Sequence, residues 1–158
     1  MRKAQTRTIS PTQKTRKTGL KSMEVPPISI SSIVVRRGRL VCEVEVPDPR
    51  YRYTNPQIAH HVLDLHPSLS RHACVNAEGR TFGCVMEHTS IAHLLEHLAV
   101  ELQTRASDDP QALFVGTSEW LDEASGKARV QLSFSDDLEA LRALKEAVEI
   151  IADSLGRI

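Results

Sequence analysis

Two histidines and a glutamate stand close together in one apolar stretch of the chain. His93, Glu96 and His97 form the pattern H-x-x-E-H within residues 91–102. Because an α-helix turns about 100° per residue, the two histidines would lie one turn apart on one face, with the glutamate beside them. Two imidazoles at this spacing can bind one zinc ion, while a neighbouring carboxylate takes a proton from a zinc-bound water. The pattern therefore predicts metal-assisted hydrolysis, with His93 and His97 as metal ligands and Glu96 as the general base.

A catalytic zinc site needs at least one more protein ligand and an open position for water. Cys74, 19 residues before His93, is the first candidate because zinc binds thiolates well. Glu101 is the second candidate, since the helical rise would put it roughly 12 Å along the axis from His93. His72 could bind the metal or orient one of its ligands from outside. The alternative is a buried helix whose histidines and glutamate bond to one another, with Cys74 a small buried apolar residue.

The charge distribution divides the chain into a tail and a body. The chain has 158 residues, enough for one domain with a real core, and its formal net charge is zero. Residues 1–22 hold seven Lys or Arg and no acid, so the rest of the chain is acidic. We predict a disordered basic tail over residues 1–24 and one folded domain over residues 25–158. An organelle transit peptide and an arm that binds a polyanion are alternatives for the tail.

Composition also bears on location and partners. No window approaches the roughly 18 consecutive apolar residues of a membrane span, so no membrane association is expected. Cys42, Cys74 and Cys84 are odd in number and widely spaced, which argues against disulfides and predicts a cytoplasmic protein. Nucleic-acid binding is disfavoured, because only the tail is basic and the body has few aromatic residues.

Hydrophobic periodicity predicts the elements that must position these residues. They are a strand hairpin over residues 28–46, a helix between residues 55 and 67, a loop over residues 72–86, a helix from Thr89 or Ser90 to about Arg105, strands over residues 112–115 and 127–134, and an amphipathic helix over residues 136–155. This order predicts an α+β two-layer sandwich, with an antiparallel or mixed sheet and helices packed on one face.

Two family resemblances meet at the same residues. Residues 91–97 look like the inverted zinc motif of pitrilysin and insulinase peptidases. A wider match over residues 51–155 is similar in order and spacing to the N-terminal domain of cyanophycin synthetase. It consists of His72-Ala73-Cys74, Glu87-His88-Thr89, residues 92–103, Gly116-Thr117, and the strand and helix over residues 130–151.

The second resemblance implies a metallopeptidase-like domain in which His93, His97 and Cys74 bind zinc and Glu96 is the general base. Some domains of that family cut the polymer of aspartate and arginine, so a peptide or cyanophycin-like substrate is expected. An acidic body would suit the guanidinium groups of such a substrate. The alternative is a non-catalytic binding or scaffolding module. In either case the chain could form a homo-oligomer or associate with a partner enzyme. No G-x-x-x-x-G-K-[ST] phosphate loop occurs, so we expect no synthetase activity from this chain alone.

Overall fold

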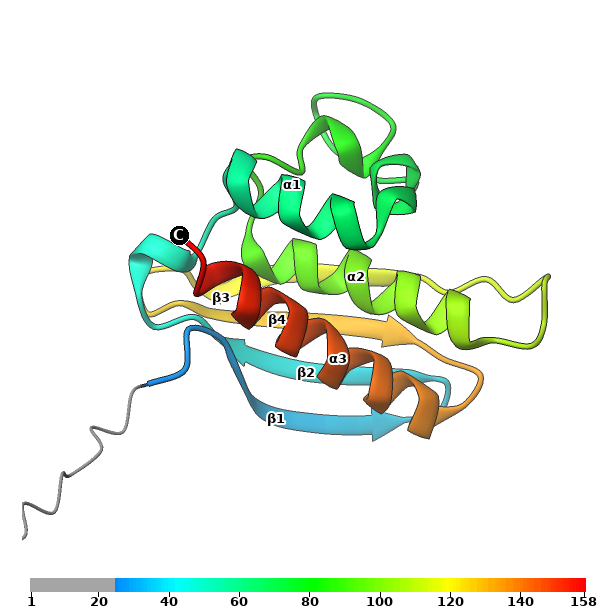
Figure 1. Ribbon diagram of the computed structural model, residues 1–158. Coiled ribbons are helices and arrows are strands. Elements are labelled where there is room, and N and C mark those ends of the chain that lie inside the picture. The colour runs from blue at the N-terminus through cyan, green and yellow to red at the C-terminus, as the bar shows by residue number, and fades with distance from the viewer. Residues whose placement is uncertain (1–24) are drawn as a thin grey trace, which may run out of the picture.

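The computed structural model describes residues 25–158, so the predicted basic tail lies outside the described residues. The described chain forms a four-stranded sheet and three α-helices, with short 3-10 turns between them (Figure 1). In chain order the elements are β1 (Ser29–Arg36), β2 (Arg39–Glu45), α1 (Pro56–Leu65), α2 (Ile91–Ala106), β3 (Gly116–Asp122), β4 (Lys127–Ser133) and α3 (Asp137–Leu155), with 3-10 turns at Pro49–Tyr51, Pro67–Arg71 and Phe82–Cys84.

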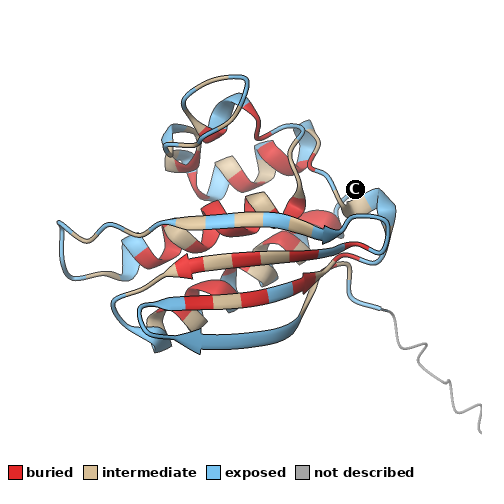
Figure 2. Ribbon diagram, turned by 180° about the vertical axis from the view of Figure 1, so that it is seen from behind, coloured by how far each residue is buried: buried red, intermediate tan, exposed pale blue. Residues whose placement is uncertain are grey.

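The sheet is antiparallel throughout and has the strand order β1-β2-β4-β3. Its inner face carries the alternate apolar residues of β2 and β4, such as Cys42 and Val130, which are fully buried. Helices α2 and α3 cover this face, while the opposite face of the sheet is largely open to solvent (Figure 2). The predicted α+β two-layer sandwich is therefore confirmed, because alternation along the strands leaves only one face apolar.

Glycines in left-handed conformations close the two hairpins. Gly38, between β1 and β2, has φ 69°, and Gly126, between β3 and β4, has φ 75°. Gly126 also accepts a hydrogen bond from the Val46 N–H at 2.8 Å, which ties the two hairpins together. A Cβ at Gly126 would lie 2.0 Å from the Val46 carbonyl oxygen, so no other residue fits there without a shift.

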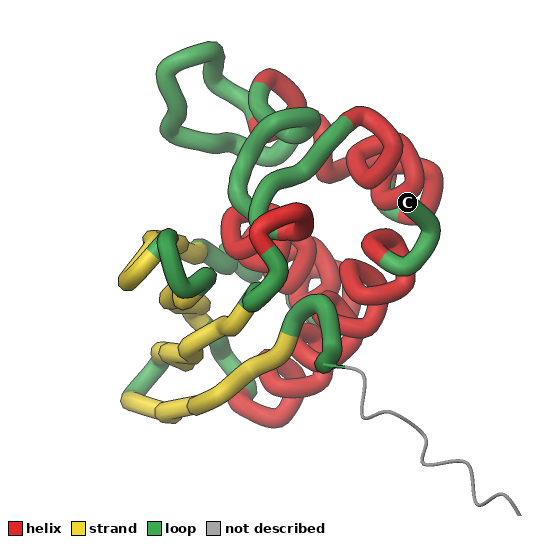
Figure 3. Tube along the Cα trace, turned by 90° about the vertical axis from the view of Figure 1, so that its left-hand side faces the viewer, coloured by secondary structure: helices red, strands yellow, loops and turns green. Residues whose placement is uncertain are grey.

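Side-chain caps fix where the flanking helices begin. The Asn55 carboxamide accepts a hydrogen bond from the Ile58 N–H at the start of α1, and Asp136 accepts one from the Glu139 N–H at the start of α3. Helix α3 packs against the sheet and α2, and α1 packs against α3 (Figure 3). Both helices lie where the sequence predicts them. None of the helices in the described part of the chain is long and apolar enough to cross a membrane.

One predicted strand is wrong. The sequence predicts a strand over the apolar residues 112–115, but they form a loop, and the strand is the more polar β3. Leu113 is 90 % exposed, so hydrophobicity does not mark a core position here. The strand forms instead where the chain can pair with β4 through the turn at Gly126. Pairing with a neighbour, which is not a local property, decided this element.

Candidate metal centre

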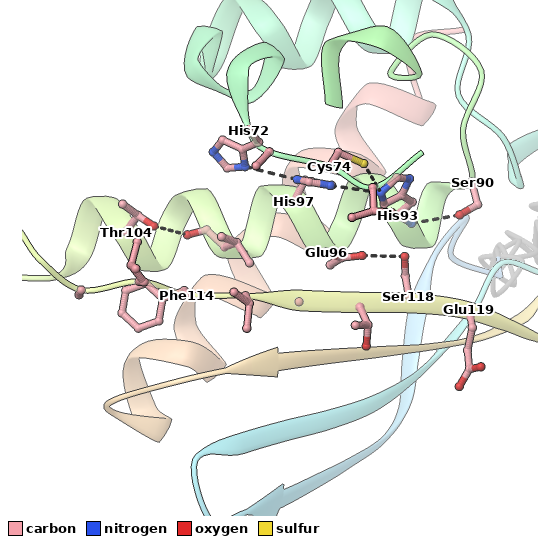
Figure 4. Close-up of a pocket in the computed structure, with 18 of the residues that line it drawn as sticks. His72, Cys74, Ser90, His93, Glu96, His97, Thr104, Phe114, Ser118 and Glu119 are labelled. Atoms are coloured by element: carbon pink, nitrogen blue, oxygen red, sulfur yellow. Dashed lines mark hydrogen bonds between the residues drawn. The ribbon is translucent and has the colours of Figure 1, made fainter. Parts of the chain in front are cut away.

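Helix α2 carries the H-x-x-E-H residues, as predicted. Its N-cap is Ser90, whose hydroxyl accepts a hydrogen bond from the His93 N–H at 3.1 Å. The apolar side of the helix, including Leu94 and Leu98, is fully buried in the core. This packing fixes the rotation of α2 and directs His93 and His97 toward the loop that precedes the helix (Figure 4).

Cys74 meets the two histidines from that loop. Its Sγ lies 3.4 Å from the His93 Nε2, and the Nε2 atoms of His93 and His97 lie 3.2 Å apart. The loop is held by an isolated antiparallel bridge between Ala73 and Thr81, in which the Cys74 N–H donates to the Arg80 carbonyl at 3.1 Å. One donor atom from each of Cys74, His93 and His97 lies within 4.8 Å of the others, so this cluster could bind a metal ion.

The remote nitrogen of each histidine has its own partner. The His93 Nδ1 lies 2.8 Å from the Thr89 hydroxyl, and the His97 Nδ1 lies 3.4 Å from the His72 Nδ1. With protons on Nδ1, both Nε2 lone pairs are free to bind a metal. Metal-ligating histidines usually have an outer partner of this kind, which fixes the tautomer and the orientation of the ring. The donor set and its outer partners therefore fit a zinc ion.

The surroundings keep these imidazoles neutral. Burial, together with the charges of His93 and His72, lowers the pKa of His97 to about 3, and burial also lowers the pKa of His93. The Phe82 ring stacks on His97, with 4.0 Å between the ring centroids, and meets His93 edge-on at 5.0 Å. Only neutral imidazole binds a metal, so this apolar wall favours the form that a metal site needs.

The Glu96 side chain leaves α2 toward β3, whereas His93 and His97 point toward the loop with Cys74 (Figure 4). The Ser118 hydroxyl donates a hydrogen bond to its Oε2 at 2.8 Å, and burial raises the pKa of the carboxyl although this hydrogen bond opposes the shift. Gly116 makes room for it, because a Cβ there would lie 2.5 Å from the Glu96 Cγ. A buried carboxyl with a raised pKa suits a group that takes and returns a proton.

Glu101, the second candidate for the third ligand, has another contact. Its carboxylate accepts hydrogen bonds from the Ser68 hydroxyl and, at 2.8 Å, from the His72 Nε2. Burial raises the pKa of Glu101, but these two hydrogen bonds and the nearby histidine charges lower it overall. Glu101 contacts His72, and His72 contacts His97. Glu101 is therefore an outer partner of the three candidate ligands and not one of them.

This arrangement predicts that Glu101→Gln weakens zinc binding, because an uncharged amide holds His72 less firmly. Loss of such an outer partner typically costs roughly 10- to 100-fold in metal affinity. Competition with a chromophoric chelator measures this affinity. Glu78→Gln is the matched control, since Glu78 pairs with His88 at the same 2.8 Å, away from the cluster. Equal affinities for the two variants would contradict the orienting role.

The cluster and Glu96 share one open cleft of about 790 Å³. Its walls are α2, the loop with Cys74, and the chain from Ala112 to Trp120, which includes the first five residues of β3. A substrate therefore has access both to the metal donors and to the carboxylate. The roles of His93, His97 and Cys74 as ligands and of Glu96 as base stay predictions, which this geometry supports.

The remaining histidines lie outside the cluster. Each meets a side chain elsewhere: His60 with Glu87, His61 with Asp153, His66 with Arg105, and His88 with Glu78. Three further residues of the site are not predicted from the sequence: Thr89 as an orienting group, Ser118 and Phe82. Thr89 stands four residues before His93, a spacing that could have indicated the contact. Nothing in the sequence marked Ser118 or Phe82.

The environments of the cysteines predict an order of reaction with iodoacetamide. Burial raises the pKa of the Cys42 thiol to about 12, whereas hydrogen bonds from Thr81 lower the pKa of the exposed Cys84 thiol. Because the thiolate reacts, we expect Cys84 to be labelled first and Cys42 to stay unlabelled in the folded protein. Added zinc should protect Cys74 alone. Mass spectrometry of the labelled peptides tests this, and labelling of Cys42 as fast as Cys84 would contradict it.

Comparison with known proteins agrees with part of the resemblance seen in the sequence. None of the curated proteins matches the chain. The family model described as "Cyanophycin synthase-like N-terminal domain" matches residues 48–155, which is most of the chain and all of the cleft. The resemblance to pitrilysin and insulinase peptidases stays a prediction. The chain thus belongs to the cyanophycin synthase-like N-terminal domain family.

Proposed function

We propose that this domain is a zinc-dependent hydrolase of amide bonds in peptides or in cyanophycin-like polymers. The observation that carries the proposal is the convergence of Cys74, His93 and His97 beside the buried Glu96 in one open cleft. Membership of the cyanophycin synthase-like family supports a substrate of this kind. A zinc ion held by these three residues would supply a Lewis acid for the amide carbonyl and for water.

The residues of the chain divide the remaining work. Thr89 and His72 orient the two imidazoles. The Phe82 ring packs against His97 and shields it from water. Glu96 accepts a proton from the attacking water and then donates it to the nitrogen of the leaving amine. Ser118 holds the Glu96 carboxylate in place through its hydroxyl.

Metal analysis followed by a hydrolysis assay tests this function. Purified full-length protein is expected to contain one zinc per chain and to cleave cyanophycin or a peptide mixture, with loss of cleavage when a chelator is added. Zinc without cleavage would overturn hydrolysis and leave a binding module of the same family. Protein that takes up no zinc would overturn the metal site itself.

A further inference from the structure

We propose that the cleft binds an extended peptide along the free edge of β3, antiparallel to that strand, with an apolar side chain directly after the cleaved bond. The inference deepens the proposed function, on which the position of the cleaved bond rests. It concerns the shape and sequence of the substrate, which the metal cluster alone does not determine.

Strand β3 is the last strand of the sheet and offers unpaired backbone groups. Among the described residues it pairs only with β4. The Ser133 N–H donates to the Val115 carbonyl at 2.8 Å. This bond shows which residues of the strand direct their backbone groups toward β4, namely Val115 and every second residue after it. Because alternate residues of an antiparallel strand bond to opposite sides, Gly116 and Ser118 direct their N–H and C=O groups away from β4. Such an edge can accept another strand.

This edge lines the same cleft as the candidate catalytic groups. The Ser118 hydroxyl bonds to Glu96 (Figure 4), and Ser118 is one of the residues that line the cleft. A strand paired with β3 would run about 4.8 Å from it. The peptide would then pass between β3 and the loop with Cys74, so its carbonyl groups would lie between Glu96 and the metal donors.

One end of the cleft is apolar and open. Val75, Leu113 and Val115 all line it, and their exposed fractions are 106 %, 90 % and 67 %. Leu113 and Val115 precede β3, so an antiparallel peptide would place the residues after the cleaved bond against them. Covering these side chains with an apolar side chain of the substrate removes apolar surface from water. The wall therefore selects an apolar residue at that position.

Charge in the cleft favours the same substrate over an arginine-rich polymer. Only two carboxylates, those of Glu96 and Glu119, line the described cleft. Glu96 is assigned to proton transfer, and Glu119 pairs with Arg129 at 3.3 Å. The cleft therefore offers a guanidinium group only the exposed Glu119, which Arg129 already neutralises. The apolar side chains at the other end have no partner among the described residues.

Binding can be measured separately from cleavage. Trp120 is the only tryptophan of the chain and lines the cleft, so its fluorescence reports whether a peptide is bound. The probes are capped alanine hexapeptides with one leucine at successive positions. They are titrated against the zinc-loaded full-length Glu96→Gln protein, which should not cleave them appreciably, while Trp120 emission is followed. A second series places N-methyl groups at successive backbone nitrogens. We expect every second N-methyl group to abolish binding, since only alternate N–H groups face β3. Loss of binding without this alternation overturns strand pairing.

Cleavage of the same peptides, read by mass spectrometry, tests the apolar position. Leucine directly after the cut should raise kcat/KM on the order of tenfold over leucine directly before it. Leu113→Asp should remove this preference. Leu121→Asp, an exposed position in β3 outside the cleft, should keep it. A preference for leucine before the cut would overturn the antiparallel orientation. Alternating N-methyl effects without cleavage would overturn the hydrolase proposal and leave strand binding intact.

Discussion

Glu96→Gln is expected to reduce peptide hydrolysis by roughly 10² to 10⁴ while zinc content stays at the wild-type level. The amide keeps the shape of the side chain and can still accept the hydrogen bond from Ser118, but it cannot take a proton from water. Removing a general base typically costs this range of rate. The loss should fall on kcat with little change in KM, because the group acts in the transition state.

The matched control for this variant is Glu119→Gln. Glu119 lines the same cleft, but its carboxylate is exposed and pairs with Arg129 rather than with Ser118. We expect near wild-type kcat for this variant. Steady-state kinetics with metal analysis of both proteins gives the comparison, and an active Glu96→Gln enzyme would show that another group moves the proton.

His97→Ala is expected to abolish tight zinc binding. The variant removes one of the three donors and also breaks the contact through which His72 and Glu101 orient the site. The affinity should therefore fall by more than the roughly 10- to 100-fold expected for loss of an outer partner alone. Competition with a chromophoric chelator measures the dissociation constant.

Thermal unfolding gives an independent measure of the same loss. Free zinc at about 1,000 times its dissociation constant stabilises a folded protein by about 4 kcal/mol, so zinc should raise the Tm of the wild type. The His97→Ala protein should show no such rise. His60→Ala is the control, since His60 is exposed and contacts Glu87, away from the three donors. A zinc-dependent rise in Tm that survives His97→Ala would place the metal elsewhere.

Local patterns predicted most of the fold. The period of the apolar residues predicts all three helices, and cap residues such as Ser90 and Asp136 mark their first turns. Alternation along β2 predicts a sheet with one buried face. The error at residues 112–115 arose where an apolar run lines a cleft rather than the core, which composition alone does not distinguish.

Part of the candidate site could also be predicted from local spacing, and part could not. The spacing of His93 and His97 needs only a helix to bring the rings together, so the pair was predictable. Cys74 was the first of several candidates for the third ligand, and the bridge between Ala73 and Thr81 brings it to the cluster. Glu101 instead faces His72, because the helical rise carries it beyond the reach of the other two donors.

The sequence by itself determined the helix that carries the donor residues and the α+β class, because both follow from near-neighbour spacing along the chain. The family follows from the match of residues 48–155 to a family model. Only the tertiary structure decided which loop meets that helix, how Ser118 and Gly116 accommodate Glu96, and that the free edge of β3 lines the cleft. These features join residues far apart in sequence. Their geometry depends on packing and strand pairing, for which no local pattern is sufficient.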